Sequence, residues 1–150
     1  MLEDKIEQDI KSALLGGDVL RLSTLRQIKS VLLNVKVASG KRATGLSDDE
    51  VLPILAKEAK KRQESADLYK QGGNQQRADK ELDEKAIIET YLPAQLSESE
   101  IQELVETTIT KTGADGPQAM GAVIAQVKKL AGPTADGAVI ARLVKDRLSS

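Results

Sequence analysis

The side chains of this chain that could take part in chemistry are carboxylates, amines, guanidinium groups, hydroxyls and two phenols. The 150-residue sequence contains neither histidine nor cysteine, so it lacks the commonest general base, the commonest metal ligand and any thiolate. Aspartates and glutamates are numerous, but no spacing groups them as a catalytic pair or as a set of metal ligands. We therefore predict no catalytic residue, no metal site and no cofactor, and a protein that is not an enzyme.

Positive charge is the second source of chemistry, because lysine and arginine bind phosphate. The whole chain has 22 basic and 23 acidic side chains and a net charge of −1, whereas a non-specific nucleic-acid binder is usually strongly basic. The positive excess is local, since residues 117–150 hold five basic and two acidic side chains, a net charge of +3. Tyr69 and Tyr91 are the only aromatic residues, too few for a platform that stacks unpaired bases. We expect no DNA binding, and any RNA must be recognised by its backbone and shape.

Two charged clusters in the first half have a structural interpretation that competes with phosphate binding. The run 57–64 could form a basic stripe, but Glu58 precedes Lys61 and Arg62 by three and four residues, the spacing of helical ion pairs. We favour a solvated helix face. Arg21 and Arg26 are separated by about 500° of helical rotation, so we expect them on different flanks of a helix, each paired with a carboxylate.

The apolar residues recur with helical spacing along nearly the whole chain, and no stretch shows the alternation of a strand, so we predict an all-α fold. Helices should begin after the capping residues Asp18, Ser47, Asn74, Ser97 and Asp136. Ser47 and Ser97 each open a capping box with a glutamate three residues later. The buried stripes are predicted to include Ala13 or Leu14, then Leu22, Leu25, Ile28, Leu32 and Val35, then Ala78, Leu82, Ala86, Ile87 and Tyr91, and finally Met120, Val123, Ile124, Val127 and Leu130.

The clearest division of the chain is at Tyr91-Leu92-Pro93, because proline disfavours helix in the residue before it. We predict a helical N-terminal domain over residues 1–92 and a small three-helix tail domain over residues 93–150. No segment approaches the roughly 18 consecutive apolar residues of a membrane span. The first residues mix charged and apolar side chains and do not resemble a signal peptide, so we expect a cytoplasmic protein with no membrane partner.

Several phrases of the sequence, taken in order, resemble the YqeY family of GatB/YqeY proteins. They are residues 9–14, 21–26, 57–65 and 91–98, followed by Ala119-Met120-Gly121, Ala135-Asp136-Gly137 and Leu143-Val144-Lys145. The resemblance extends over essentially the whole chain. It implies a helical N-terminal domain and a tail similar to the C-terminal domain of the B subunit of the tRNA-dependent amidotransferase, which helps to hold the tRNA.

The resemblance also implies which positions face tRNA and which partners to expect. By carry-over the tail positions are Gly121, Lys128, Lys129, Asp136, Gly137 and Lys145, and the local positive charge adds Arg142. The partners would be tRNA, a tRNA-dependent amidotransferase or an aminoacyl-tRNA synthetase. Sequence physics assigns Asp136 a different role, since a helix-capping aspartate satisfies the first amides and repels phosphate. This chain also has Pro133-Thr134 where the family commonly carries a basic residue.

Three hypotheses for function follow from these observations. The leading one is a non-catalytic accessory protein that binds tRNA or a tRNA-handling enzyme through its tail. The alternative is a protein-interaction adaptor whose N-terminal helices dock another protein, with tRNA irrelevant. The sequence argues against the third, an independent carbon–nitrogen ligase that uses glutamine as amido donor, because nothing in it matches the catalytic core of the amidotransferase.

Overall fold

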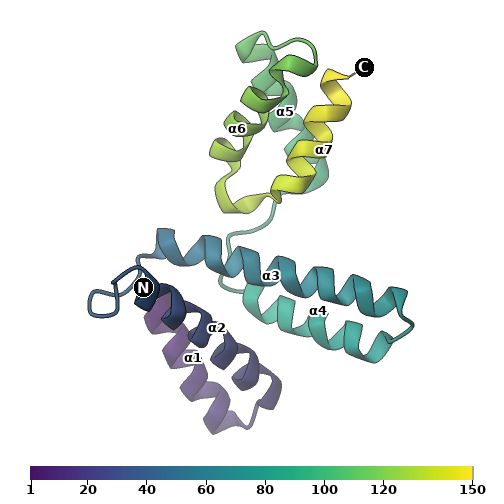
Figure 1. Ribbon diagram of the computed structural model, residues 1–150. Coiled ribbons are helices and arrows are strands. Elements are labelled where there is room, and N and C mark those ends of the chain that lie inside the picture. The colour runs from purple at the N-terminus through teal and green to yellow at the C-terminus, as the bar shows by residue number, and fades with distance from the viewer. Residues whose placement is uncertain (150) are drawn as a thin grey trace. The chain divides into compact units, whose positions relative to one another are not determined.

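The computed structural model describes residues 1–149, and every regular element in that range is helical (Figure 1). The prediction of an all-α fold is therefore confirmed. The helices are α1 (Leu2–Gly16), α2 (Val19–Ala38), α3 (Asp48–Gln71), α4 (Gln75–Glu89), α5 (Glu98–Thr112), α6 (Met120–Ala131) and α7 (Gly137–Leu148), with short 3-10 turns η1 (Pro117–Ala119) and η2 (Gly132–Thr134) on either side of α6.

The helix starts are set locally, by the capping residues that the sequence predicts. The caps of α2, α3, α4, α5 and α7 each accept a hydrogen bond from a backbone amide of the first turn, and they are Asp18, Ser47, Asn74, Ser97 and Asp136. The capping box at Ser97 is complete. At α3 the Glu50 carboxylate also binds Lys41 Nζ at 2.7 Å. The ends of α1 and α5 are formed by Gly17 and Gly113, whose left-handed φ angles of 70° and 68° favour glycine.

The chain divides into two compact units, Met1–Leu92 and the part that begins at Pro93. We call them the N-terminal unit and the tail unit. Independent folding of each unit stays a prediction. In the N-terminal unit, α1 packs along α2 and α3 packs along α4 (Figure 1). These two hairpins share one hydrophobic core of Ile6, Leu25, Ile28, Leu32, Leu46, Val51, Leu55, Ala59, Ile88 and Tyr91.

The tail unit is a bundle of α5, α6 and α7 around a second core. That core consists of Ile101, Val105, Ile109, Val123, Val127, Ala131, Ile140, Leu143, Val144 and Leu148. The segment before α5 is held to the bundle, because the Leu96 amide donates to the Thr134 carbonyl at 2.8 Å and Gln95 Nε2 donates to the Pro133 carbonyl at 3.0 Å. The turn η2 thus anchors the start of the tail unit.

Of the alternatives Ala13 and Leu14, Ala13 is the buried one, and two other positions predicted to be buried are exposed in the structure. Leu14 and Leu130 are 56% and 58% exposed, and Ala86 is also exposed. Ala13 and Ala131, the neighbours of Leu14 and Leu130, are buried instead, and so is Ile88, two residues after Ala86. Neighbouring helical residues point only about 100° apart. Two adjacent apolar residues at the edge of a buried stripe therefore fit the helical periodicity equally well. The direction from which the next helix packs decides between them.

Candidate nucleic-acid interface

Gly121 and Lys128 lie on the same face of α6. They are seven residues apart, which is within about 20° of two full turns and about 10 Å along the helix axis. Both are exposed. A Cβ atom placed on Gly121 would have no heavy atom within 4 Å, so the backbone there is open to solvent. The face therefore combines a bare stretch of backbone near its start with an ammonium group near its end.

Lys128 and Gly137 come together although they belong to different helices. A Cβ atom on Gly137 would lie 3.0 Å from Lys128 Cε and 3.3 Å from Lys128 Nζ. The first distance is closer than carbon atoms normally pack, so the lysine side chain occupies space that only glycine leaves vacant. The structure thus brings two of the predicted tRNA-facing residues into contact, at the start of α7.

Three amides at the start of α7, those of Ala138, Val139 and Ile140, already have acceptors. The Asp136 carboxylate accepts from the Ala138 amide at 2.9 Å, and the Asp136 carbonyl accepts from the amides of Val139 and Ile140 at 3.1 Å each. The capping role predicted for Asp136 from sequence physics is therefore confirmed. A phosphate group would find a carboxylate at this helix start, so phosphate binding in the tail depends on lysine and arginine side chains.

The four cations predicted to face tRNA fall into two groups. Lys128, Lys129 and Lys145 are exposed and form no ion pair with any residue of the described chain. Arg142 is engaged, because its Nη2 lies 2.6 Å from Glu98 Oε1 of α5, and this carboxylate raises the pKa of the Arg142 guanidinium. A phosphate at Arg142 would share the guanidinium with Glu98, which already offsets its charge, whereas none of the three lysines has an ion-pair partner in residues 1–149.

The three lysines point in different directions. Lys128 and Lys129 are adjacent on α6 and about 100° apart. Lys145 is two turns beyond Gly137 on α7, about 80° round the axis from it. The arrangement suits several separate contacts along a phosphate backbone better than a tight clamp on one phosphate group.

The charged residues 57–64 of α3 were predicted to form a solvated helix face, and the structure differs from this in part. The ion pairs from Glu58 to Lys61 and to Arg62 are present, at 3.3 and 2.6 Å. However, Glu58 and Arg62 are only 6% and 8% exposed, so the interpretation of a solvated face is wrong for these two residues. Arg62 Nη2 also donates to Gln27 Oε1 of α2 at 3.0 Å. Because α3 packs against α2 and α4, part of its polar face is turned toward the interior. The spacing of polar residues in the sequence does not reveal this.

Residues from three separate phrases of the sequence meet at Asp9. Its carboxylate accepts a hydrogen bond from the Tyr91 hydroxyl and lies 3.6 Å from Arg21 Nη2. The Tyr91 hydroxyl, helped by Lys5 and Arg21, lowers the pKa of Asp9, and burial together with the Asp9 carboxylate raises the pKa of Tyr91. This cluster fastens the segment after α4 to α1 and α2, so it stabilises the fold.

The prediction of a carboxylate partner is confirmed for Arg21 and wrong for Arg26. Arg26 is exposed and forms no ion pair within residues 1–149. Sequence reasoning missed Asp9 as the partner of Tyr91 because the two are separated by 82 positions and no local signal connects them.

No group of three or more Asp or Glu side chains in residues 1–149 is placed to hold a metal ion. No helix in the same range is long and apolar enough to cross a membrane. The fold and the surface define an all-helical protein with two compact units, the second of which presents uncompensated lysines. Residues 3–148 match the family described as Yqey-like protein. The chain therefore belongs to the YqeY family. A comparison with curated proteins found no match.

Proposed function

We propose that this protein is a non-catalytic accessory protein that binds tRNA through its tail unit and thereby assists a tRNA-handling enzyme. The observation that carries the proposal is the surface of α6 and α7, where Lys128, Lys129 and Lys145 are exposed and form no ion pair in the described chain. Lysines without a nearby carboxylate contribute most to the affinity for a phosphate backbone, since each one that binds a phosphate releases counterions of the RNA.

Gly121 and Gly137 allow an RNA backbone to come close to the surface of α6 and α7. Gly121 has no side chain to keep a sugar–phosphate backbone away from α6, and Gly137 gives the Lys128 side chain its place across the start of α7. Contacts of this kind read the shape and backbone of a folded RNA. They do not require the aromatic side chains that single-stranded RNA usually needs.

The number of available cations determines the expected salt dependence. Three phosphate contacts predict a slope of log K against log salt of about −2.1 to −2.7, so affinity should fall roughly 20- to 40-fold between 50 and 200 mM salt. The variant Lys128→Glu with Lys145→Glu removes two contacts and adds repulsion. It should abolish binding of folded tRNA in a fluorescence anisotropy titration and leave the melting temperature nearly unchanged, because both side chains are exposed.

The matched control is Lys57→Glu with Lys80→Glu. These two lysines of the N-terminal unit are also exposed, and the net charge of the protein changes by the same amount. This control should keep its affinity for tRNA. The titrations are repeated with a single strand of equal length. Equal affinity for folded and single-stranded RNA, or equal loss of binding in both double variants, would refute tRNA binding by the tail.

A further inference from the structure

Helix α2 has a second apolar face besides the one in the core. Leu25, Ile28 and Leu32 are buried against the rest of the N-terminal unit. About 130° round the helix from the centre of this buried face, six residues lie within about 60° of a single line along the helix. We call them the outer stripe, and they are Val19, Leu22, Arg26, Ser30, Leu33 and Val37.

The outer stripe is exposed to solvent except at Leu22, which is half-buried. Val19, Leu33 and Val37 are 77%, 41% and 57% exposed. From the first of these residues to the last the stripe extends about 27 Å. A surface helix of a globular protein ordinarily has one apolar face. A second one, in which four of six residues are apolar, is typical of a helix that packs against a partner on both sides.

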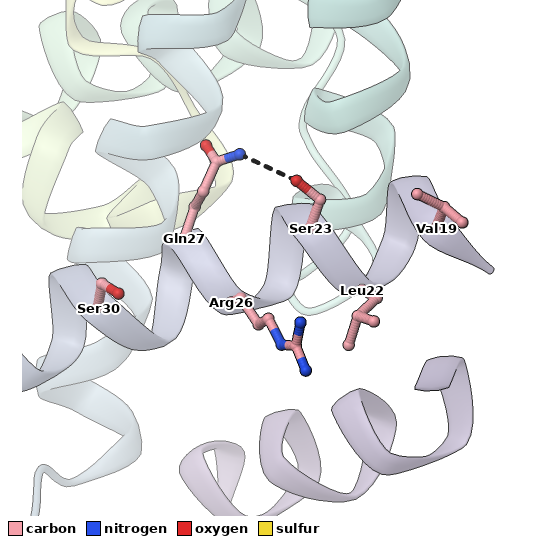
Figure 2. Close-up of a pocket in the computed structure, with 6 residues that line it drawn as sticks. All are labelled: Val19, Leu22, Ser23, Arg26, Gln27 and Ser30. Carbon is pink, nitrogen blue, oxygen red and sulfur yellow. Dashed lines mark hydrogen bonds between the residues drawn. The ribbon is translucent and has the colours of Figure 1, made fainter. Parts of the chain in front are cut away.

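The middle of the outer stripe is polar and carries a free positive charge. Arg26 is exposed and has no ion-pair partner in residues 1–149. The residues around it line a shallow depression on α2 (Figure 2). In this view Leu22 and Arg26 lie on one flank of the helix, and Ser23 and Gln27 lie on the other. The surface therefore offers apolar contacts at both ends and a cation with hydrogen-bonding groups at the centre.

We propose that the outer stripe docks an amphipathic helix of another protein, one with apolar residues three and four apart and a carboxylate near its centre. Helices recognise such grooves and faces by apolar anchors at this spacing. The carboxylate would pair with Arg26, which otherwise would be covered without a counter-charge. This surface belongs to the N-terminal unit and shares no residue with the lysines proposed to bind RNA.

The charge pattern argues against two other occupants. In an antiparallel contact between two copies, centred near residue 28, each Arg26 would face Ser30 of the second copy. The stripe contains no carboxylate, so both guanidinium groups would stay unpaired in the seam. A lipid surface would match the apolar ends but would cover Arg26 and Ser30 with acyl chains.

The test uses synthetic peptides and the full-length protein. The probe is a helical peptide of about 20 residues with leucines three and four apart and one central glutamate, and the comparison peptide has lysine in its place. Because Arg26 is close to the middle of the stripe, a central glutamate can reach it in either direction of binding. The glutamate peptide should bind at least tenfold more tightly than the lysine peptide in a fluorescence anisotropy titration.

Two variants and a control connect binding to the outer stripe. Leu33→Ser with Val37→Ser should weaken binding of the glutamate peptide at least tenfold. Arg26→Glu should reverse the preference, so that the lysine peptide binds more tightly. The matched control is Leu68→Ser on α3, which also replaces a mostly exposed leucine, 68% accessible, and should leave binding unchanged. Circular dichroism and melting temperature establish that each variant is folded.

Four outcomes would overturn the proposal. The first two are no binding of the glutamate peptide at about 100 micromolar and equal binding of both peptides. The other two are equal losses of binding in the stripe and control variants, and a dimer in sedimentation analysis that the stripe variant converts to a monomer. If phosphatidylcholine–phosphatidylglycerol vesicles bind in competition with the peptide, the occupant of the outer stripe would be a membrane surface and the proposal of a docked helix would be wrong. Loss of tRNA binding in the lysine reversals leaves the peptide result unaffected, so failure of either proposal is distinguishable from failure of the other.

Discussion

The pair between Glu58 and Arg62 allows a quantitative test of how the N-terminal unit is packed. Both side chains are more than nine-tenths buried. Arg62 Nη1 lies 2.6 Å from Glu58 Oε2 and Nη2 lies 3.0 Å from Gln27 Oε1. Arg62→Met removes the charge and keeps an unbranched apolar stem. The Glu58 carboxylate then stays buried, with only the largely exposed Lys61 ammonium at 3.3 Å.

The structure sets the size of the expected effect. Breaking a buried ion pair by removing one partner costs about 3–5 kcal/mol. We expect the lower end, about 3 kcal/mol, because Lys61 still partly compensates the Glu58 carboxylate. For a unit of this size each kcal/mol lowers the melting temperature by roughly 4–8 °C, so Arg62→Met should melt roughly 12–24 °C below the wild type. Thermal and urea unfolding followed by circular dichroism measure both quantities.

A second variant distinguishes the cost of an unpaired charge from the loss of packing. Glu58→Leu combined with Arg62→Met replaces the pair by apolar side chains, which is often neutral or stabilising. We expect its free energy of unfolding to lie within about 1 kcal/mol of the wild type. Arg26→Met, a change at an exposed arginine of α2, is the control and should stay within about 0.5 kcal/mol. The reasoning is refuted if Arg62→Met costs less than about 1 kcal/mol, or if the double variant is as unstable as the single one.

Four further results are expected. Tyr91→Phe removes the hydrogen bond to the Asp9 carboxylate and should cost about 1.5–3 kcal/mol in urea unfolding, whereas a cost near zero would show that water replaces the hydroxyl. Glu81 has its pKa raised above the ordinary value of 4.5, first by burial and then by Glu84, so its contribution to stability is present below pH 4.5 and is lost as the pH rises above it. Glu81→Gln should therefore gain melting temperature relative to the wild type at pH 7 more than at pH 4, and the exposed Glu64→Gln should show no such difference. A fragment of residues 93–150 should fold alone, with a cooperative thermal transition that a non-cooperative loss of helicity would contradict. The purified protein should not amidate charged tRNA in the presence of glutamine and ATP, and turnover that a point substitution in this chain abolishes would prove it an enzyme.

Local signals in the sequence were sufficient for the helix boundaries and the fold class. A capping residue acts on amides two or three positions away, so Asp18, Asn74 and Ser97 could be recognised without knowledge of any other helix. Glycine at Gly17 and Gly113 ends a helix for an equally local reason. The capping residues were predicted correctly because the atoms that interact are neighbours in the chain.

The sequence also identified the cations of the tail, but only the tertiary structure showed which of them have a carboxylate partner. Lys128 and Arg142 look alike as exposed cations on amphipathic helices. Packing of α7 near α5 places Glu98 against Arg142, whereas Lys128 extends across Gly137 and stays without a carboxylate partner in the described chain. Partners 44 positions apart leave no periodic trace in a sequence.

The same reason explains the errors in the N-terminal unit. Periodicity identifies a polar face of a helix, but the spacing is the same whether that face is turned toward solvent or toward a neighbouring helix. The Glu58–Arg62 pair proved to be buried, and Arg26 proved to have no ion-pair partner within residues 1–149. Burial and pairing depend on the directions in which separate helices approach one another, and those directions are determined by the packing of all the side chains together.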